Sequence, residues 1–516
     1  MDLNQLLTLI NPVIRFYKWI YILYLHKINP FIRFCYLNLT SMMIGRKQEK
    51  KTLQHILDKK KSSFVAVTGR RRIGKSYLID NFFEKNLCFR VTGIQNATLQ
   101  KQIRNFADRI SAFSKNPIPT NPNNWQEVFF HLRWYLSSLD KKTKQVIFID
   151  ELPWIATARS GYLQLLAHLW NDYLSKEKHF ILVVCGSASS WLTSKIVNDK
   201  GGLHNRITDI INLKPFNLKE TKLFLEAQNI SLNPQEIAKL YMTLGGVPFY
   251  LEQVKKGDSA AIAIERICFS DKGALKHEYD NLYKALFRNS DKHEAIVKTL
   301  AKKSKGLTRK ELINLSKINA GGSYTRTIDD LLLSGFITEF IPFGKKKRGV
   351  KYRLNDEFSI FYHRFMKKNK KFVNGMWSQI TATQSYKIWQ GYAFENLCFK
   401  HIDEIKKAIG IAAVYTEVSS YDIVGNSDEK GFQIDLLIDR NDNVINLCEI
   451  KYHAAPFKMD KKYANYLIER SQRFVERSKT KKQIFNTLIT NFPFVDNVHS
   501  TGVIDVKIGL DDIFDD

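Results

Sequence analysis

The chain has 516 residues, of which 79 are basic and 51 acidic, giving a formal net charge of +28. This length predicts about three domains rather than one core, and a hydrophobic content of 44% excludes a wholly disordered chain. The positive excess favours polyanionic partners, nucleic acid above all; a generally lysine-rich composition without functional meaning is the alternative. Six scattered cysteines without a CxxC pair argue against a disulfide framework or a zinc site and indicate a reducing, cytoplasmic compartment.

The first 42 residues are apolar and aromatic but are interrupted by Lys18, Lys27 and Arg33. Their longest uncharged run is shorter than the roughly 18 to 20 residues needed to span a bilayer, and no signal-peptide cleavage site follows. Three interpretations remain: a basic interfacial helix, a helix packed on the body of the protein, or a mistranslated upstream extension. Met42 and Met43 precede a natural domain start at IGRKQEKKTLQHIL, which favours the third.

The segment SSFVAVTGRRRIGKSYLIDNFF carries the strongest local signal. An apolar run at 64–68 predicts a buried strand, a helical pattern begins at Tyr77, and residues 69–76 between them fit G-x-x-x-x-G-K-[ST]. In that motif backbone N–H groups surround a phosphate, the lysine reaches the β- and γ-phosphates and the serine ligates Mg²⁺; an exposed glycine turn beside a basic cluster is the alternative. The predicted ATP-binding residues are Gly69, Arg70, Arg71, Arg72, Ile73, Gly74, Lys75, Ser76 and Tyr77.

A second apolar run, in KQVIFIDELPW, ends in Asp150 and Glu151. At the end of a buried strand beside a phosphate loop, Asp150 is expected to hold Mg²⁺ through water, and Glu151 to orient the attacking water for hydrolysis. Two solvated acids at a strand end are the alternative. A third run, HFILVVCGSASSWL, leads to Ser187, which is expected to contact the γ-phosphate or the attacking water.

Arg206 is a candidate arginine finger, a cation that stabilises the charge developing on the transferred phosphoryl group. A surface arginine is equally compatible with the sequence.

Strands alternating with helical stretches predict a parallel sheet covered by helices on both faces. Residues 216–290 show helical patterns without strands and predict a lid over the nucleotide. Residues 293–353 show three short helical segments and then two β-rich runs, which predicts a winged helix with its third helix in the major groove. Protein binding is the alternative for that module.

The segment FQIDLLIDRNDNVINLCEIKY predicts a hairpin with its turn at Asp442, which places Asp435 opposite Glu449 and puts Lys451 on the same face as Glu449. Facing carboxylates destabilise a sheet unless a cation such as a divalent metal neutralises them. Lys451 would then stabilise an attacking hydroxide or the charge on a phosphate. Glu395, on or near the apolar stripe of an upstream helix, is the third candidate metal ligand.

Several of these segments resemble a known family. In order over roughly residues 43–460, IGRKQEKKTLQHIL, GRRRIGKS, FIDELPW, VVCGSASS and LGGVPFYL resemble the archaeal-type ATPase family within the AAA+/STAND group of P-loop proteins. The resemblance implies that Ser187 is the sensor-1 residue, although Asn or Thr is commoner there, that Arg206 is the finger, and that Gly245-Gly246 with Pro248 closes the lid. Members of this family often end in a restriction-endonuclease-like domain.

The C-terminal residues resemble a nuclease superfamily. Glu395, Asp435 and Glu449-x-Lys451, in this order over roughly residues 385–495, resemble PD-(D/E)xK nucleases, with Ile434 where a proline is usual. The resemblance implies a metal-dependent site at these residues. A nuclease-like fold with a silent site, or an unrelated hairpin with solvated charges, is the alternative.

The predicted fold class is therefore α/β: a parallel-sheet P-loop NTPase core with a helical lid, a winged helix and a C-terminal α/β restriction-endonuclease-like domain. The predicted parts are an extension at 1–42, the ATPase core at 43–215, the lid at 216–290, the winged helix at 291–356 and the nuclease-like domain at 357–516.

The predicted function is ATP hydrolysis coupled to a metal-dependent nuclease acting on DNA. The predicted cofactors are ATP and Mg²⁺, with Mn²⁺ as an alternative at the nuclease site, and assembly into a homo-oligomer is left open. The first rival is an ATP-switched DNA-binding regulator with a silent C-terminal domain. The second is a scaffold recruited to an anionic membrane by its N-terminus, which is the less favoured.

Overall fold

The computed structural model describes residues 43–118, 122–157, 159–187, 189–198, 201–287, 289–345, 349–368, 375–423, 425 and 431–514. The predictions for the extension at 1–42 lie outside these residues, and so do Lys346, Lys347 and Arg348 between the two β-rich runs of the predicted winged helix. No helix among the described residues has the length and apolarity needed to cross a membrane.

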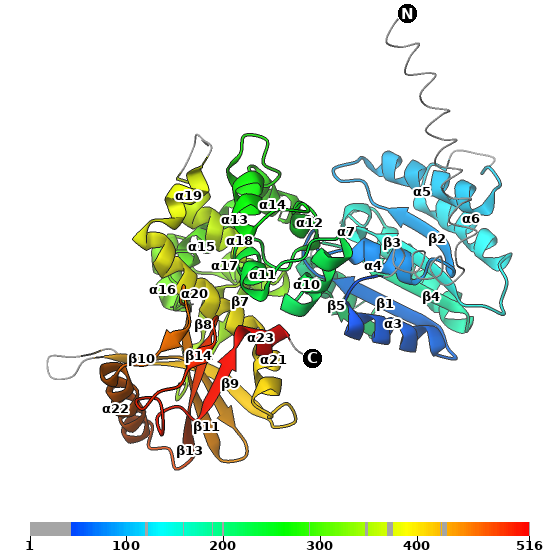
Figure 1. Ribbon diagram of the computed structural model, residues 1–516. Helices are drawn as coiled ribbons and strands as arrows, with labels where there is room; N and C mark the ends of the chain where they lie inside the picture. Colours follow the sequence, from blue (N-terminus) through cyan, green and yellow to red (C-terminus); the bar gives the residue numbers. More distant parts are fainter. Residues whose placement is uncertain are drawn as a thin grey trace, which may run out of the picture. The chain divides into compact units, whose positions relative to one another are not determined.

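A five-stranded parallel sheet in the order β2-β3-β4-β1-β5 forms the N-terminal core. Its strands are β1 (Ser63–Thr68), β2 (Leu87–Thr92), β3 (Gln145–Asp150), β4 (Phe180–Cys185) and β5 (Asp209–Asn212). Strands β1 and β4 are buried along their whole length, so their sequences are continuously apolar. Figure 1 shows helices around this sheet, and the predicted parallel-sheet core is confirmed.

The helices of the core are α3 (Lys47–Asp58), α4 (Lys75–Phe82), α5 (Leu99–Ser114), α6 (Trp125–Ser137), α7 (Leu152–Ile155), α8 (Tyr162–Asp172) and α9 (Ser189–Leu192). One hydrophobic cluster joins the sheet to α5, α6 and α8, with Phe106, Trp125 and Tyr162 in mutual ring contact. In a parallel sheet all strands end at the same edge, where ligands bind. The loops after β1, β3 and β4 therefore meet at one place.

The stretch after β5 is helical, as predicted. It contains α10 (Leu218–Ala227), α11 (Pro234–Leu244), α12 (Pro248–Leu251), α13 (Ala260–Ile264) with a π-helical turn at Glu265–Phe269, and α14 (Glu278–Leu286). Asn217 begins α10 with a reciprocal capping box to Glu220, and Asn233 caps α11. Such caps satisfy N–H groups that have no partner within the helix.

The following segment has the order of elements expected for a winged helix. It comprises α15 (Asp291–Leu300), β6 (Leu307–Thr308), α16 (Arg309–Ser316), α17 (Gly322–Leu333), β7 (Ile337–Phe340) and β8 (Lys351–Leu354). The three strands form an antiparallel sheet in the order β6-β8-β7. The third helix, α17, contacts α9 of the N-terminal core, and its binding to DNA stays a prediction.

The C-terminal part contains a second five-stranded sheet in the order β15-β13-β11-β10-β9. Its strands are β9 (Thr416–Ile423), β10 (Phe432–Arg440), β11 (Val444–Lys451), β13 (Gln483–Thr490) and β15 (Val506–Gly509), with a separate pair β12 (Phe457–Lys458) and β14 (Phe494–Val495). Strands β9, β10 and β11 are antiparallel, whereas β11, β13 and β15 are parallel. Helices α18 (Glu357–Phe361), α19 (Met376–Thr381), α20 (Gln384–Lys400), α21 (Ile402–Ala408), α22 (Lys461–Ser478) and α23 (Leu510–Phe514) accompany it.

The two faces of this sheet pack against different helices. Leu436 and Cys448 belong to the cluster that includes α20, whereas Leu437 and Leu447 pack in a separate cluster with Phe474 of α22. Successive residues of a strand point to opposite faces. Glu449, two residues beyond Leu447, therefore faces α22.

The predicted hairpin register is confirmed. Leu436 pairs with Cys448 and Asp439 with Ile445, the alignment expected for a turn at Asp442. The described pairs end at Leu436 and Cys448, so the pairing of Asp435 with Glu449 stays a prediction.

His401 connects α10 to the C-terminal part. This buried imidazole donates from Nδ1 to Leu397 O (2.8 Å) and accepts at Nε2 from Leu218 N (2.9 Å), at the start of α10. Burial lowers the pKa of His401 to about 4. The hydrogen bond to Leu397 O raises this pKa, and the charge of Lys400 lowers it further. The folded protein therefore keeps the ring neutral.

The unfolded chain binds a proton at His401 below its ordinary pKa of 6.5, so we expect the unfolding free energy to fall as the pH is lowered from 6.5 towards 4. Protonation of this ring should lower the unfolding free energy by about 3 kcal/mol over that pH range. Above pH 6.5 its contribution to stability is fully present. Urea unfolding of the parent and of His401→Gln at pH 7 and pH 4.5 measures it. The variant should show a smaller decrease, and equal decreases in both proteins would contradict the assignment.

Candidate nucleotide site and C-terminal carboxylate site

The loop after β1 follows a path that only glycine permits at its first residue. Gly69 has φ +134°, and a Cβ there would lie 2.4 Å from Leu213 O. Its N–H donates to Ser189 Oγ (3.1 Å). Gly74, with φ +87°, immediately precedes α4, so the N–H groups at the start of that helix face the loop, as a phosphate site requires.

Lys75 and Ser76 are the first two residues of α4. Lys75 is buried, and its Nζ donates to Gly69 O and Arg70 O (both 2.8 Å) and to Ser187 Oγ (3.2 Å). Ser76 Oγ donates to Asp150 Oδ2 (2.7 Å). A hydroxyl and a carboxylate oxygen side by side at the loop are hard oxygen ligands of the kind Mg²⁺ prefers, so these two residues fit the ion.

Glu151 is held by Ser187, which lies just after the neighbouring strand β4. Its backbone is left-handed (φ 47°, ψ 48°), and its carboxylate accepts from Ser187 Oγ at Oε1 (2.5 Å) and from Ser187 N at Oε2 (3.1 Å). Because Ser187 Oγ also accepts from Lys75, the three side chains form one hydrogen-bonded chain. Ser187 thus orients the residue predicted to activate water.

We expect Ser187→Ala to lower kcat for ATP hydrolysis by about 10²-fold, because misplacing a reacting group by about 1 Å has an effect of that size. Phosphate release at saturating ATP measures it. Ser194→Ala, which removes an exposed hydroxyl bonded only to Trp191 O (3.1 Å), is the matched control. A variant faster than the parent would indicate instead that Ser187 restrains Glu151 in an inactive position.

The other residues predicted in the loop differ in exposure and in their partners. Ile73 is buried, Arg71 is half-buried and Tyr77 is 58% exposed. Arg70 and Arg72 extend from the loop to acidic partners in later parts of the chain. Arg206 is exposed in a turn, and within the described part of the chain no contact joins it to the phosphate loop. Its role as a finger stays a prediction.

In the C-terminal sheet, Glu449 is buried and surrounded by hydrogen-bond donors. Its Oε1 accepts from Tyr463 OH (2.5 Å) and lies 2.7 Å from Lys451 Nζ, while its Oε2 pairs with Arg470 Nη1. Burial alone would raise the pKa of Glu449, but Arg470 and then Lys451 outweigh it and hold the pKa below its usual value. Glu449 is therefore a charged, fully compensated carboxylate.

Asp435 and Glu395 have raised pKa values, in contrast to Glu449. Burial, and then repulsion from Glu449, raises the pKa of Asp435 to about 6. Burial, and then repulsion from Asp435, raises the pKa of Glu395 to about 8. Asp435 accepts at Oδ1 from Gln433 Nε2 (3.3 Å) and at Oδ2 a long hydrogen bond from Ile450 N (3.4 Å). Among the described residues neither Asp435 nor Glu395 makes a close ion pair as Glu449 does, and a cation between them would offset their charge.

The predicted metal ligands therefore fit a divalent ion in part. Asp435 and Glu395 interact electrostatically and have oxygens of the right chemistry, whereas Glu449 already pairs with two cations. Across the described segments, no group of three His, Cys, Asp or Glu side chains is placed to hold a metal.

Sequence reasoning missed Tyr463 and Arg470. Helix α22 buries one stripe, which consists of Ala464, Leu467, Arg470 and Phe474. An arginine within an apolar helical stripe requires an anionic partner, because an isolated buried charge is very unfavourable. That signal could have indicated Arg470, but not that its partner is Glu449.

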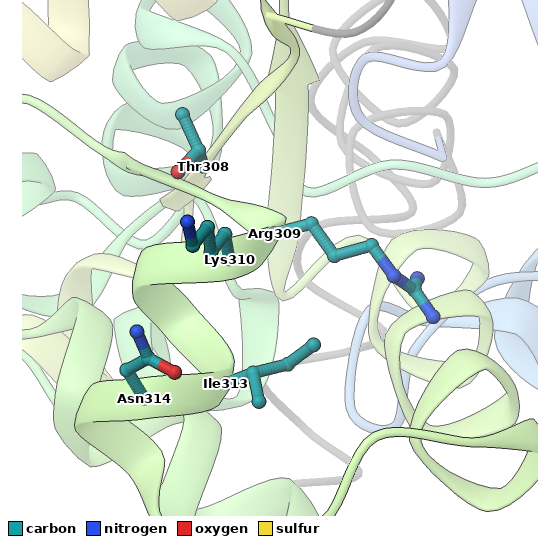
Figure 2. Close-up of a pocket in the computed structure, with 5 residues that line it drawn as sticks. All are labelled: Thr308, Arg309, Lys310, Ile313 and Asn314. Carbon is teal, nitrogen blue, oxygen red and sulfur yellow. The ribbon is translucent and has the colours of Figure 1, made fainter.

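A surface pocket of about 490 Å³ lies on α16, apart from both sites, and Figure 2 shows the residues that line it. They are Thr308, Arg309, Lys310, Ile313 and Asn314. Arg309 extends away from Thr308, Lys310 and Asn314 and donates to Thr325 Oγ1 of α17 (2.7 Å). The two basic residues of the pocket, Arg309 and Lys310, lie on α16, the second helix of the predicted winged helix.

Comparison with known proteins finds a family match in the first part of the chain. Residues 43–254 match the model of an ATPase domain predominantly from Archaea. The matched segment contains the loop at 69–76, Asp150, Glu151 and Ser187, and extends through α12. An uncharacterized protein of Methanocaldococcus jannaschii is 25% identical over 418 residues, which is 80% of this chain and 88% of that protein.

Two solved structures are similar to parts of the chain. A Walker-type ATPase of Pyrococcus abyssi has 19% identity and a TM-score of 0.46, over 62% of this chain and 96% of that one. The ORC2 protein of Aeropyrum pernix, in ADPNP-ADP complexes, has 14% identity and a TM-score of 0.38, over 66% of this chain and 95% of that one.

Proposed function

We propose that this protein is a Mg²⁺-dependent ATPase acting on DNA, in which the bound nucleotide controls a metal-dependent phosphodiesterase site in the C-terminal domain. The ATPase half has the support of the family match at 43–254. The C-terminal half is supported by the arrangement of charged residues on β10, β11 and α20.

At the nucleotide site each residue has a role that its contacts support. Lys75 would exchange its bonds to Gly69 O and Arg70 O for phosphate oxygens. Glu151, oriented by Ser187, would accept the proton of the attacking water as ATP is converted to ADP and phosphate. Ser76 and Asp150 would hold Mg²⁺, which supplies positive charge to the phosphates.

The observation that carries the nuclease is the pair of half-buried carboxylates, Asp435 and Glu395, near Lys451, whose pKa values are both raised. Perturbed carboxylates with a lysine at hand are typical of catalytic sites, whereas structural ion pairs are compensated. Here Asp435 and Glu395 would hold Mg²⁺ or Mn²⁺, whose chemistry is to polarise a phosphate and lower the pKa of bound water. Lys451 would stabilise charge on the phosphodiester.

A second candidate is an ATP-switched DNA-binding regulator whose C-terminal domain does not cleave. The compensation of Glu449 by Arg470 and Lys451 favours it, because that carboxylate can then be a structural ion-pair partner rather than a ligand. In this case the basic surface would bind DNA without cutting it.

Cleavage assays separate the two candidates. Supercoiled plasmid and short single- and double-stranded DNA are incubated with Mg²⁺ or Mn²⁺, with and without ATP. Nicking that is lost in Asp435→Ala and altered in Lys75→Ala supports the nuclease. The control is Asp439→Asn, which removes a half-buried carboxylate of the same strand that pairs with Lys482 (2.6 Å). Intact ATP hydrolysis without cleavage under any condition would support the regulator.

A further inference from the structure

The phosphate loop is joined by buried ion pairs to residues far along the chain. Arg70 is 5% exposed and pairs through Nη1 with Asp356, which is 1% exposed. Arg72 pairs with Glu278 of α14 and stacks on Phe249 (4.0 Å). Burial alone would raise the pKa of Asp356, but Arg70 outweighs it and holds the pKa low. Two arginines within a nucleotide-binding loop are thus committed to protein carboxylates.

Hydrogen bonds from Ser359 hold Asp356 in place. Its Oδ2 accepts from Ser359 N (2.9 Å) and Ser359 Oγ (2.5 Å), which caps α18. Tyr283 OH, from α14, lies 2.8 Å from the same Ser359 hydroxyl. A movement of Arg70 would therefore act on the beginning of α18 rather than on a free side chain.

The same short segment holds α20 from its other side. Glu357 pairs with Lys400, the last residue of α20 (2.5 Å). Arg353, on β8, stacks on Phe399 of α20 (3.9 Å) and interacts electrostatically with Glu395. Helix α20 also packs against β11, the strand that carries Glu449.

We propose that residues 353–357 form the link between the nucleotide site and the C-terminal carboxylate site. At one end Arg70 of the phosphate loop holds Asp356, and at the other end Arg353 and Glu357 hold the helix that carries Glu395. We call this segment the coupling segment. The inference deepens the proposed function, on which it rests, by naming the route of nucleotide control.

The first step of this route lies in the loop itself. Lys75 Nζ donates to the carbonyl oxygen of Arg70 (2.8 Å), so a lysine that turns to bind phosphate releases the backbone of the residue that holds Asp356. Gly245 lies at the same point, because a Cβ there would be 2.8 Å from Glu357 Oε2 and 3.8 Å from Arg70 Nη2. Any such coupling is reciprocal, so a ligand at the C-terminal site must alter nucleotide affinity by the same factor.

Hydrogen exchange measured by mass spectrometry tests the link without relying on cleavage. The full chain with Glu151→Gln, which keeps ATP unhydrolysed, is compared with and without Mg²⁺-ATP. We expect ATP to change the exchange of peptides within 353–361 and 384–400 several-fold. Adding Asp356→Asn, which retains the cap on α18 but removes the charge, should abolish the change at 384–400 while a fluorescent ATP analogue still binds.

Asp439→Asn is the matched control, because its ion pair lies in the C-terminal sheet but outside the coupling segment, and it should leave the response intact. If circular dichroism shows that Asp356→Asn does not fold, Lys400→Gln breaks the other end of the link at a partly exposed position. An unchanged response in the folded link variant, or no response in the parent, overturns the inference. Absence of DNA cleavage alone would overturn only the proposed nuclease.

Discussion

Glu151→Gln is expected to lower kcat for ATP hydrolysis by about 10²- to 10⁴-fold, the range that a positioned general base contributes. The amide keeps the size of the side chain and can still accept one hydrogen bond from Ser187, but it cannot take a proton from water. ATP affinity should stay close to that of the parent, because Lys75, Ser76 and the loop are unchanged. Steady-state phosphate release and equilibrium binding of a fluorescent ATP analogue measure the two quantities.

Glu177→Gln is the control for this effect, since that carboxylate is half-buried and makes an ion pair with Lys141 (3.1 Å) away from the loop. It should hydrolyse ATP at the rate of the parent. Turnover of Glu151→Gln within a fewfold of the parent would show that another group activates the water, and would remove Glu151 from the proposed mechanism.

Arg470→Met is expected to lower the unfolding free energy by about 3–5 kcal/mol, the usual effect of removing one partner of a buried ion pair. Arg470 is 1% exposed and Glu449 is 5% exposed, so water cannot replace the lost guanidinium. Lys451 and Tyr463 stay in contact with Glu449, which places the effect towards the lower end of that range. Urea unfolding followed by circular dichroism measures it.

A double variant separates charge from packing. Glu449→Gln combined with Arg470→Met removes both charges and should recover a large part of the lost stability, as replacing a whole buried pair often does. Lys141→Met, which breaks an exposed pair, should change stability by less than about 1 kcal/mol. A double variant that is less stable than either single variant would mean that Arg470 acts mainly by filling space.

The sequence carried the local features of both sites. Continuous apolar runs predicted β1, β3 and β4, and the glycines of the loop predicted its path. Alternation along 432–452 predicted the hairpin with its register. Each of these follows from residues within about ten positions of one another, where periodicity and turn chemistry decide the structure.

The contacts between distant parts of the chain could not be read in this way. Arg70 and Asp356 are 286 residues apart, and no sequence pattern near either residue predicts that they pair. Arg70 was predicted to bind nucleotide as a member of the motif, yet its side chain pairs with Asp356, the last residue of the predicted winged helix. Likewise, Glu449 pairs with Arg470 because α22 crosses the face of the sheet opposite to α20, a matter of topology rather than of spacing.

The turn at 441–443 has a consequence for how this chain can change during evolution. Surface turns usually accept insertions and deletions, and Asn441, Asp442 and Asn443 have the composition of such a turn. A change of one residue in its length would shift β11 by one position against β10 and reverse its faces. Glu449 and Lys451 would then point towards α20, while Cys448 and Ile450 would turn towards α22. In relatives that keep this site, the turn should vary in residue identity while its length stays fixed.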